Sequence, residues 1–145
     1  MITGAYVENT SGLAVLAAAT NALSPDTIIT QASYFCIERI LMLLDNDNGQ
    51  AAQNCTVTIN FVSSNCTLAN GTIPVSIFTG AGLYNKNGKP LLIIPPNENI
   101  NIIYTNATAT TQTFHIEFSG YYVDDAGLRA SGGQALNKVL INTIL

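Results

Sequence analysis

The only histidine of the chain, His115, stands two residues before an acid, Glu117. Residues at i and i+2 of a β-strand lie on the same face, so the imidazole and the carboxylate are expected side by side. Such a pair can transfer protons in hydrolytic catalysis. Any exposed strand face can carry one, however, so we interpret His115 and Glu117 as surface residues. The adjacent acids Asp124 and Asp125 point apart at a strand end and are typical of a solvated turn.

Three cysteines, Cys36, Cys55 and Cys66, are the candidate nucleophiles and metal ligands. They include no C-x-x-C pair, and with one histidine they cannot complete a four-ligand zinc site. Cys36 lies in the apolar segment 34–37, which predicts burial, a raised thiol pKa and no nucleophilic role. We therefore expect an unreactive core thiol, no metal and no cofactor.

A disulfide between Cys55 and Cys66 requires that the two residues lie opposite each other across a hairpin. The turn expected at Ser63-Ser64-Asn65 instead places Cys66 opposite Phe61 or Val62. We predict free thiols, as suits a reducing compartment.

Two loops resemble ligand-binding motifs but depart from them in detail. Residues 45–50 (D-N-D-N-G-Q) alternate oxygen ligands as a calcium loop does, but a full loop needs glycine at Gln50 and a bidentate glutamate at Thr56. We expect a polar turn there, with a weak cation site near Asp45 and Asp47 as the alternative. The glycines at 80–82 and 88 lack the spacing of a phosphate loop, and Pro90 stands where a serine or threonine should follow.

Charge is scarce along the whole chain. Of 145 residues only 10% are charged and 48% are apolar, whereas an ordinary soluble domain is roughly 25% charged. Five Lys and Arg against nine Asp and Glu give a net charge of -4, and the basic residues form no run. This balance disfavours nucleic-acid binding through phosphate neutralisation.

The apolar content raises the question of a membrane segment. A spanning helix needs about 20 consecutive mostly apolar residues, and Asn, Thr or Ser interrupts every candidate. The purest run, Leu13 to Ala19, is too short. It also lacks the basic flank of a secretory signal, because no Lys or Arg precedes Arg39. We expect a chain that starts near Met1, is made in a cytoplasm and contacts no membrane.

Alternation of apolar and polar residues predicts strands with one dry and one wet face. The clearest strand is Cys55–Val62, and Thr111 to about Val123 shows the same pattern, with His115 and Glu117 outward. Shorter strands are expected at Ile73–Phe78, Leu91–Ile94, Asn99–Tyr104, Thr27–Gln31 and Ser33–Leu44, the last with Glu38 and Arg39 inside an apolar stretch. Turns are expected at Asn87-Gly88, at Pro95 to Asn99 and at Thr105–Thr110.

Seven or eight short strands without a helical period predict an all-β fold, a single antiparallel β-sandwich or jelly roll. We divide the chain into an N-terminal apolar arm or short helix (1–24), a β-sandwich core (25–130) and a C-terminal apolar segment (131–145). In the last segment, Leu136, Val139, Leu140 and Thr143 follow the spacing of a helix, with a last strand as the alternative.

Few charged side chains leave Asn, Thr, Ser, Gly and apolar groups to cover the exterior, and such a surface tends to associate. We therefore expect a symmetric homo-oligomer whose apolar end segments are buried against neighbours. The candidate interaction residues are Leu13, Val15, Leu16, Leu136, Val139, Leu140 and Ile144.

The region Ile73–Val123 contains a Phe-Thr-Gly loop, the run K-P-L-L-I-I-P-P-N-E-N-I-N-I, a T-N-A-T turn and a final F-H-I-E-F-S-G-Y-Y-V strand. In this it resembles small structural proteins of tailed-bacteriophage virions. The resemblance covers about a third of the chain. It implies a non-enzymatic capsid decoration (cement) protein, often a trimer, that binds the major capsid protein or another virion protein and is assembled in the host cytoplasm.

Two alternatives stay open. The same composition fits a phage head-neck, tail or fibre component. A sugar-recognising receptor-binding sandwich would use Tyr84, Tyr104, Tyr121 or Tyr122 with loop amides.

Overall fold

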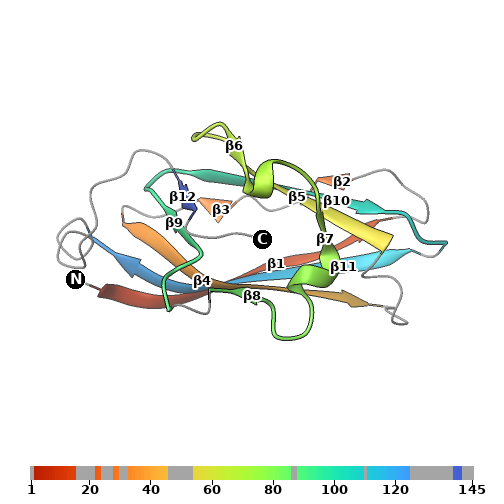
Figure 1. Ribbon diagram of the computed structural model, residues 1–145, viewed down its shortest axis with the longest axis horizontal. Coiled ribbons are helices and arrows are strands. Elements are labelled where there is room, and N and C mark those ends of the chain that lie inside the picture. Colours follow the sequence, from red (N-terminus) through yellow and green to blue (C-terminus); the bar gives the residue numbers. More distant parts are fainter. Residues whose placement is uncertain are drawn as a thin grey trace.

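The computed structural model describes residues 2–15, 22–23, 28–29, 33–45, 54–85, 88–109, 111–124 and 139–141. Within these ranges the chain forms strands and two short 3-10 helices, and the strands assemble into two antiparallel sheets. The predicted all-β fold is confirmed. The long strands of both sheets run along the long axis of the molecule (Figure 1).

The first sheet, sheet A, has the strand order β1-β11-β4-β9-β12, and β8 also pairs with β4. Its members are β1 (Ile2–Val15), β4 (Tyr34–Asp45), β8 (Leu83–Tyr84), β9 (Leu92–Ile94), β11 (Gln112–Val123) and β12 (Leu140–Ile141). The second, sheet B, has the order β2-β10-β5-β6, with β3 against β10 and β7 against β5. Its members are β2 (Ala22–Leu23), β3 (Ile28–Ile29), β5 (Cys55–Phe61), β6 (Cys66–Thr67), β7 (Ile73–Pro74) and β10 (Asn99–Asn106).

The core lies between the two sheets and follows the alternation read from the sequence. Every second residue of β5 and of β10 is buried, and the residues between them are half-buried. The largest fully buried side chains come from both sheets and from the segment that joins them: Phe35, Phe61, Phe78, Tyr104, Phe114 and Phe118. Since burial of apolar surface is the main favourable term in folding, this shared core holds the sheets together.

The predicted strand Ile73–Phe78 is wrong in its last four residues. The strand β7 ends at Pro74, and residues Val75–Phe78 form a 3-10 helix, η2, in which Val75 and Phe78 are buried. Proline has no N–H for the ladder, so pairing with β5 cannot continue through it. A second 3-10 helix, η1, spans Leu68–Asn70.

The connection expected at Thr105–Thr110 joins two different sheets. β10 belongs to sheet B and β11 to sheet A, so the chain crosses the sandwich here. Buried Asn106 stabilises the crossing, because its side-chain oxygen accepts hydrogen bonds from the Thr108 N–H (2.9 Å) and the Thr108 hydroxyl (2.6 Å).

The end segments contribute strands to sheet A. Leu13 and Val15 lie in β1, opposite Phe114 and Gln112 of β11. At the other end, Leu140 and Ile141 pair with β9 as a last strand, and Val139 packs against the main core. The other candidate interaction residues, Leu16, Leu136 and Ile144, lie outside the described residues. So does Thr143, so only Val139 and Leu140 of the predicted helical spacing are described.

Candidate functional site

His115 and Glu117 lie on the outer face of sheet A, opposite Leu43 and Leu41 of β4. Both are half-buried, and they alternate along β11 with the buried residues Phe114, Ile116 and Phe118. The sequence placed them correctly on one face. Across the described residues, no three His, Cys, Asp or Glu side chains gather in a way that could hold a metal ion.

The three cysteines are free thiols. Cys66 lies opposite Phe61 in the β5–β6 pair, as the predicted turn requires. Cys36 is buried with Tyr34, Ile93 and Val123 in a small cluster separate from the main core. Desolvation by this burial raises the pKa of the Cys36 thiol to about 11; a hydrogen bond with Tyr121 opposes the shift and the nearby Glu38 charge adds to it. At neutral pH the thiol is therefore protonated and unreactive.

The structure describes only parts of the two loops that resemble ligand-binding motifs. Asp45 ends β4, and Asp47 lies outside the described residues, so the structure leaves the weak cation site a prediction. Gly80, Gly82 and Gly88 all have positive φ, as tight surface turns need. Asp124 follows the end of β11, and Asp125 is also outside the described residues.

The four tyrosines considered for sugar stacking differ in exposure. Tyr104 and Tyr122 are buried, where they stack on Phe114 and Phe35, so their rings cannot reach a ligand. Tyr121 is half-buried against the Cys36 cluster. Tyr84 is 42% exposed and lies on the outside of sheet A.

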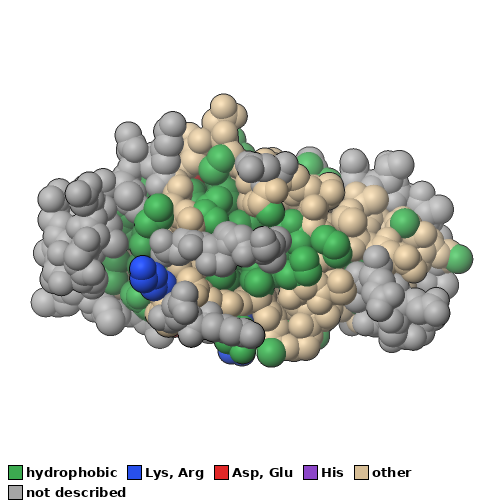
Figure 2. All heavy atoms as spheres, viewed as in Figure 1, with side chains coloured by type: hydrophobic (Ala, Val, Ile, Leu, Met, Phe, Trp, Pro, Cys, Tyr) green, Lys and Arg blue, Asp and Glu red, His purple; other side chains and the backbone are tan. Residues whose placement is uncertain are grey.

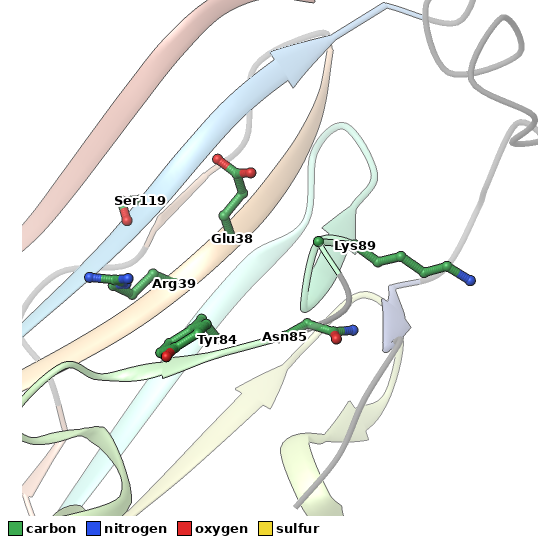
Figure 3. Close-up of a pocket in the computed structure, with 7 residues that line it drawn as sticks. Glu38, Arg39, Tyr84, Asn85, Lys89 and Ser119 are labelled. Carbon is green, nitrogen blue, oxygen red and sulfur yellow. The ribbon is translucent and has the colours of Figure 1, made fainter.

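Tyr84 lines a surface pocket of about 330 Å³ together with Glu38, Arg39, Asn85, Lys89 and Ser119. The pocket lies where β4 changes partners: residues 35–37 pair with β9 and residues 39–40 with β8. In Figure 3, Glu38 and Arg39 extend from β4 and Tyr84 from β8.

A β-bulge in β4 gives the pocket its charged side chains. Arg39 is opposite Ser119 and Ile37 is opposite Gly120, so Glu38 is an extra residue between them. Glu38 and Arg39 are consequently both exposed, where a regular strand would bury one of the two. Bulges redirect side chains in this way beside functional sites.

Two glycines allow the close strand approach that surrounds the bulge. A Cβ on Gly120 would lie 1.9 Å from the carbonyl oxygen of Cys36, and a Cβ on Gly82 would lie 2.7 Å from that of Ile40. Only glycine fits either position without displacing backbone. The close approach of β4 therefore explains why the first residue of the Gly-Tyr-Tyr sequence near the end of β11 is a glycine.

The Arg39 guanidinium lies over the Tyr84 ring, with its central carbon 5.0 Å from the ring centroid. This cation–π contact restricts a side chain that would otherwise sample many rotamers. Figure 3 shows the Glu38 carboxylate pointing away from the guanidinium and Lys89 extending away from the Arg39–Tyr84 pair. The pocket thus presents an oriented cation, a separate carboxylate, and the polar groups of Asn85 and Ser119.

Glu38 and Arg39 are two adjacent charges inside an apolar stretch of the sequence, but the sequence does not identify them as a site. The site forms only through a long-range contact: Tyr84 is 45 positions from Arg39 in the sequence, and the pairing of β8 with β4 brings the two residues together. The two adjacent charges in an otherwise apolar strand were the available signal for a bulge.

A second feature concerns assembly rather than ligand binding. β1 is 14 residues long and, among the strands that the structure describes, stands at the end of the order of sheet A, where β11 is its neighbour. At the usual rise per residue it extends for about 45 Å. Its sequence contains one charged residue, Glu8, and no proline, so it lacks the residues that commonly protect an edge strand from pairing with another chain.

No helix in the described parts of the chain is long and apolar enough to cross a membrane. Comparison with protein-family models, with curated proteins and with solved structures finds no match.

Proposed function

We propose that this chain is a non-enzymatic structural subunit of a phage virion, a capsid decoration or cement protein that stabilises the shell by contacts between subunits. The observation that carries the proposal is the 14-residue edge strand β1 of sheet A. A long edge without proline and with one charge is a ready template for strand addition by a neighbour.

The surface composition supports the same conclusion. On the face seen in Figure 2, hydrophobic side chains lie across the middle and charged ones are few. Leu43 in the middle strand β4 is 56% exposed, and Leu140 in the last strand β12 is 40% exposed. Permanent interfaces are the more apolar kind, so a subunit with this surface is suited to continuous contact with other chains.

The partners under this proposal are copies of the same chain, with a trimer as the expected order, and the major capsid protein. The trimer and the capsid partner rest on the resemblance of Ile73–Val123 to phage virion proteins. A head-neck, tail or fibre location fits the same surface and is the alternative within this class.

Light scattering on the purified full chain, followed by co-sedimentation with empty shells of the phage that encodes it, tests the proposal. We expect a discrete oligomer that binds the shells in saturable amounts. A monomer at every concentration with no affinity for shells would overturn it. An oligomer that binds purified tails or necks and leaves shells unbound would replace the decoration role with the alternative.

A further inference from the structure

We infer that the pocket at the β4 bulge binds one acidic saccharide unit, a sugar that carries a carboxylate. The inference depends on the oriented Arg39 and is independent of the assembly role proposed above. A volume of about 330 Å³ lies at the small end of the range of ligand pockets, roughly 300–1,000 Å³, which suits a single ring.

The carboxylate specificity comes from Arg39. An arginine guanidinium pairs with a carboxylate through two parallel N–H groups, and it keeps its charge at every physiological pH. The guanidinium carbon lies 5.0 Å from the centroid of the Tyr84 ring, and a cation–π contact uses the charge of the guanidinium without using its N–H donors, which therefore stay available for such pairing. Lys89 also lines the pocket, but its side chain extends away from the Arg39–Tyr84 pair (Figure 3).

The hydroxyl specificity comes from the other polar groups. A sugar ring presents several hydroxyl groups, each a donor and an acceptor. The Glu38 carboxylate can accept hydrogen bonds from such donors, and the Ser119 hydroxyl can both donate and accept. The Glu38 carboxylate points away from Arg39 (Figure 3), so its oxygens are directed at a different part of a ligand from the guanidinium.

A simple anion would not need this combination. Acetate has no hydroxyl group to donate to the Glu38 carboxylate, so a site for a simple carboxylate alone gains nothing from Glu38. A neutral sugar would not need Arg39 in a chain with only five basic residues. A ligand with one carboxylate and several hydroxyl groups can pair with Arg39 through the carboxylate and with Glu38 and Ser119 through the hydroxyl groups.

The test is an NMR titration of the full chain, labelled with nitrogen-15, with glucuronate. Glucose serves as the hydroxyl-only probe and acetate as the carboxylate-only probe. We expect saturable shifts at the amides of Glu38, Arg39, Tyr84 and Ser119 with glucuronate, and at least tenfold weaker binding of either single-feature probe. Equal binding of acetate or of glucose would overturn the acidic-saccharide assignment, as would the absence of saturable shifts with glucuronate.

Variants locate the binding in the pocket. Arg39→Ala is expected to weaken glucuronate binding at least tenfold. Arg39→Lys keeps the charge without the planar guanidinium, so its affinity for glucuronate should lie between that of the native chain and that of Arg39→Ala. His115→Ala is the matched control, because His115 lies on the same face of sheet A outside the pocket. Arg39 is exposed, so these variants should fold, which circular dichroism checks. Unchanged affinity in folded Arg39→Ala would overturn the proposal.

The methyl glycoside of glucuronate distinguishes the source of the sugar. Binding equal to that of glucuronate indicates a unit within a polysaccharide, whereas binding of the free sugar alone indicates a monosaccharide ligand. Both results uphold the acidic-saccharide site.

Discussion

The ring of Tyr104 in β10 stacks on the ring of Phe114 in β11, with centroids 4.5 Å apart and planes 20° apart. Both side chains are fully buried, and the two strands belong to different sheets. The pair also flanks the crossing at residues 107–111, where the chain passes from sheet B to sheet A. It therefore fixes the distance between the sheets at the end of the sandwich where the connection is short.

Replacing Phe114 by alanine should leave a cavity between the sheets. We expect a loss of about 3–5 kcal/mol in the free energy of unfolding for Phe114→Ala and less than about 1.5 kcal/mol for Phe114→Leu, which keeps most of the volume. Urea denaturation followed by tyrosine fluorescence measures both. A loss below about 1 kcal/mol for the alanine variant would show that the stacked pair does not hold the sheets together.

Gly120 should tolerate no side chain. A Cβ there would lie 1.9 Å from the Cys36 carbonyl oxygen, so Gly120→Ala must separate β11 from β4 at the bulge. We expect a loss of about 3 kcal/mol or more, and a change in the amide chemical shifts of Glu38 and Arg39. Gly71→Ala is the control, because a Cβ on Gly71 meets nothing within 4 Å; it should change stability by less than about 1 kcal/mol. Equal effects of the two substitutions would contradict the close approach at Gly120.

A buried glutamate organises the turn between β5 and β6 and the C-terminal strand. The Glu98 side chain accepts hydrogen bonds from the N–H groups of Ser63 (2.7 Å) and Ser64 (3.0 Å) and from the Ser64 hydroxyl. The Ser64 hydroxyl oxygen in turn accepts a hydrogen bond from the Val139 N–H (2.9 Å). Residues distant in the chain are thus connected through one hydroxyl group.

The two adjacent serines provide a matched pair for testing this network. Ser64→Ala should cost about 1–3 kcal/mol, because buried partners lose a hydrogen bond, and it should speed hydrogen exchange at the Val139 amide. Ser63→Ala should stay within about 0.5 kcal/mol, because the exposed Ser63 hydroxyl makes only a 3.5 Å contact with the Asn97 carbonyl. Unchanged exchange at Val139 in Ser64→Ala would contradict the connection to β12.

Stability should fall at alkaline pH through Cys36. Desolvation raises the pKa of its thiol from 9.0 to about 11 on folding, and burial also raises the pKa of Tyr121 above 10.0. A raised folded-state pKa favours the folded protein below the unfolded value, and this contribution is lost as the pH rises from about 9 to about 11. Urea denaturation across this range, compared between the native chain and Cys36→Ala, measures it. The variant should show a shallower decline, and identical slopes would refute the assignment to Cys36.

Much of the fold could be predicted because its strands alternate between a dry and a wet face. Cys55–Val62 was predicted one residue longer than the observed β5, and Thr111–Val123 one residue longer than β11. Alternation is local, so it needs no knowledge of the partner strand. The strand order of the sheets is not local, and nothing in the sequence placed β1 against β11 or β12 against β9.

The candidate pocket could not be predicted for the same reason. It depends on a bulge at Glu38, on the close approach at Gly120 and on the pairing of Arg39 with Tyr84. The loop predicted at Pro95 to Asn99 is confirmed for residues 95–98, and Asn99 begins β10. The sequence does not predict that Glu98 in this loop is fully buried, because its hydrogen-bond partner Ser64 lies in a turn 34 residues earlier.

The edge of β1 can be tested with two neighbouring substitutions, Val7→Pro and Glu8→Pro. In an antiparallel ladder the backbone groups of one residue point to one neighbouring strand and those of the next residue point the opposite way. One proline therefore removes a hydrogen bond to β11 and destabilises the monomer. The other removes a donor from the open edge and leaves the pairing with β11 intact.

The most direct measurement is the molar mass of the native chain and of these two variants by light scattering. We predict that the native chain is an oligomer, and that the proline variant that keeps the pairing with β11, which is the more thermally stable of the two, has the mass of a monomer. A native chain that is monomeric at all concentrations, or an oligomer of unchanged mass in both proline variants, would contradict assembly through the β1 edge.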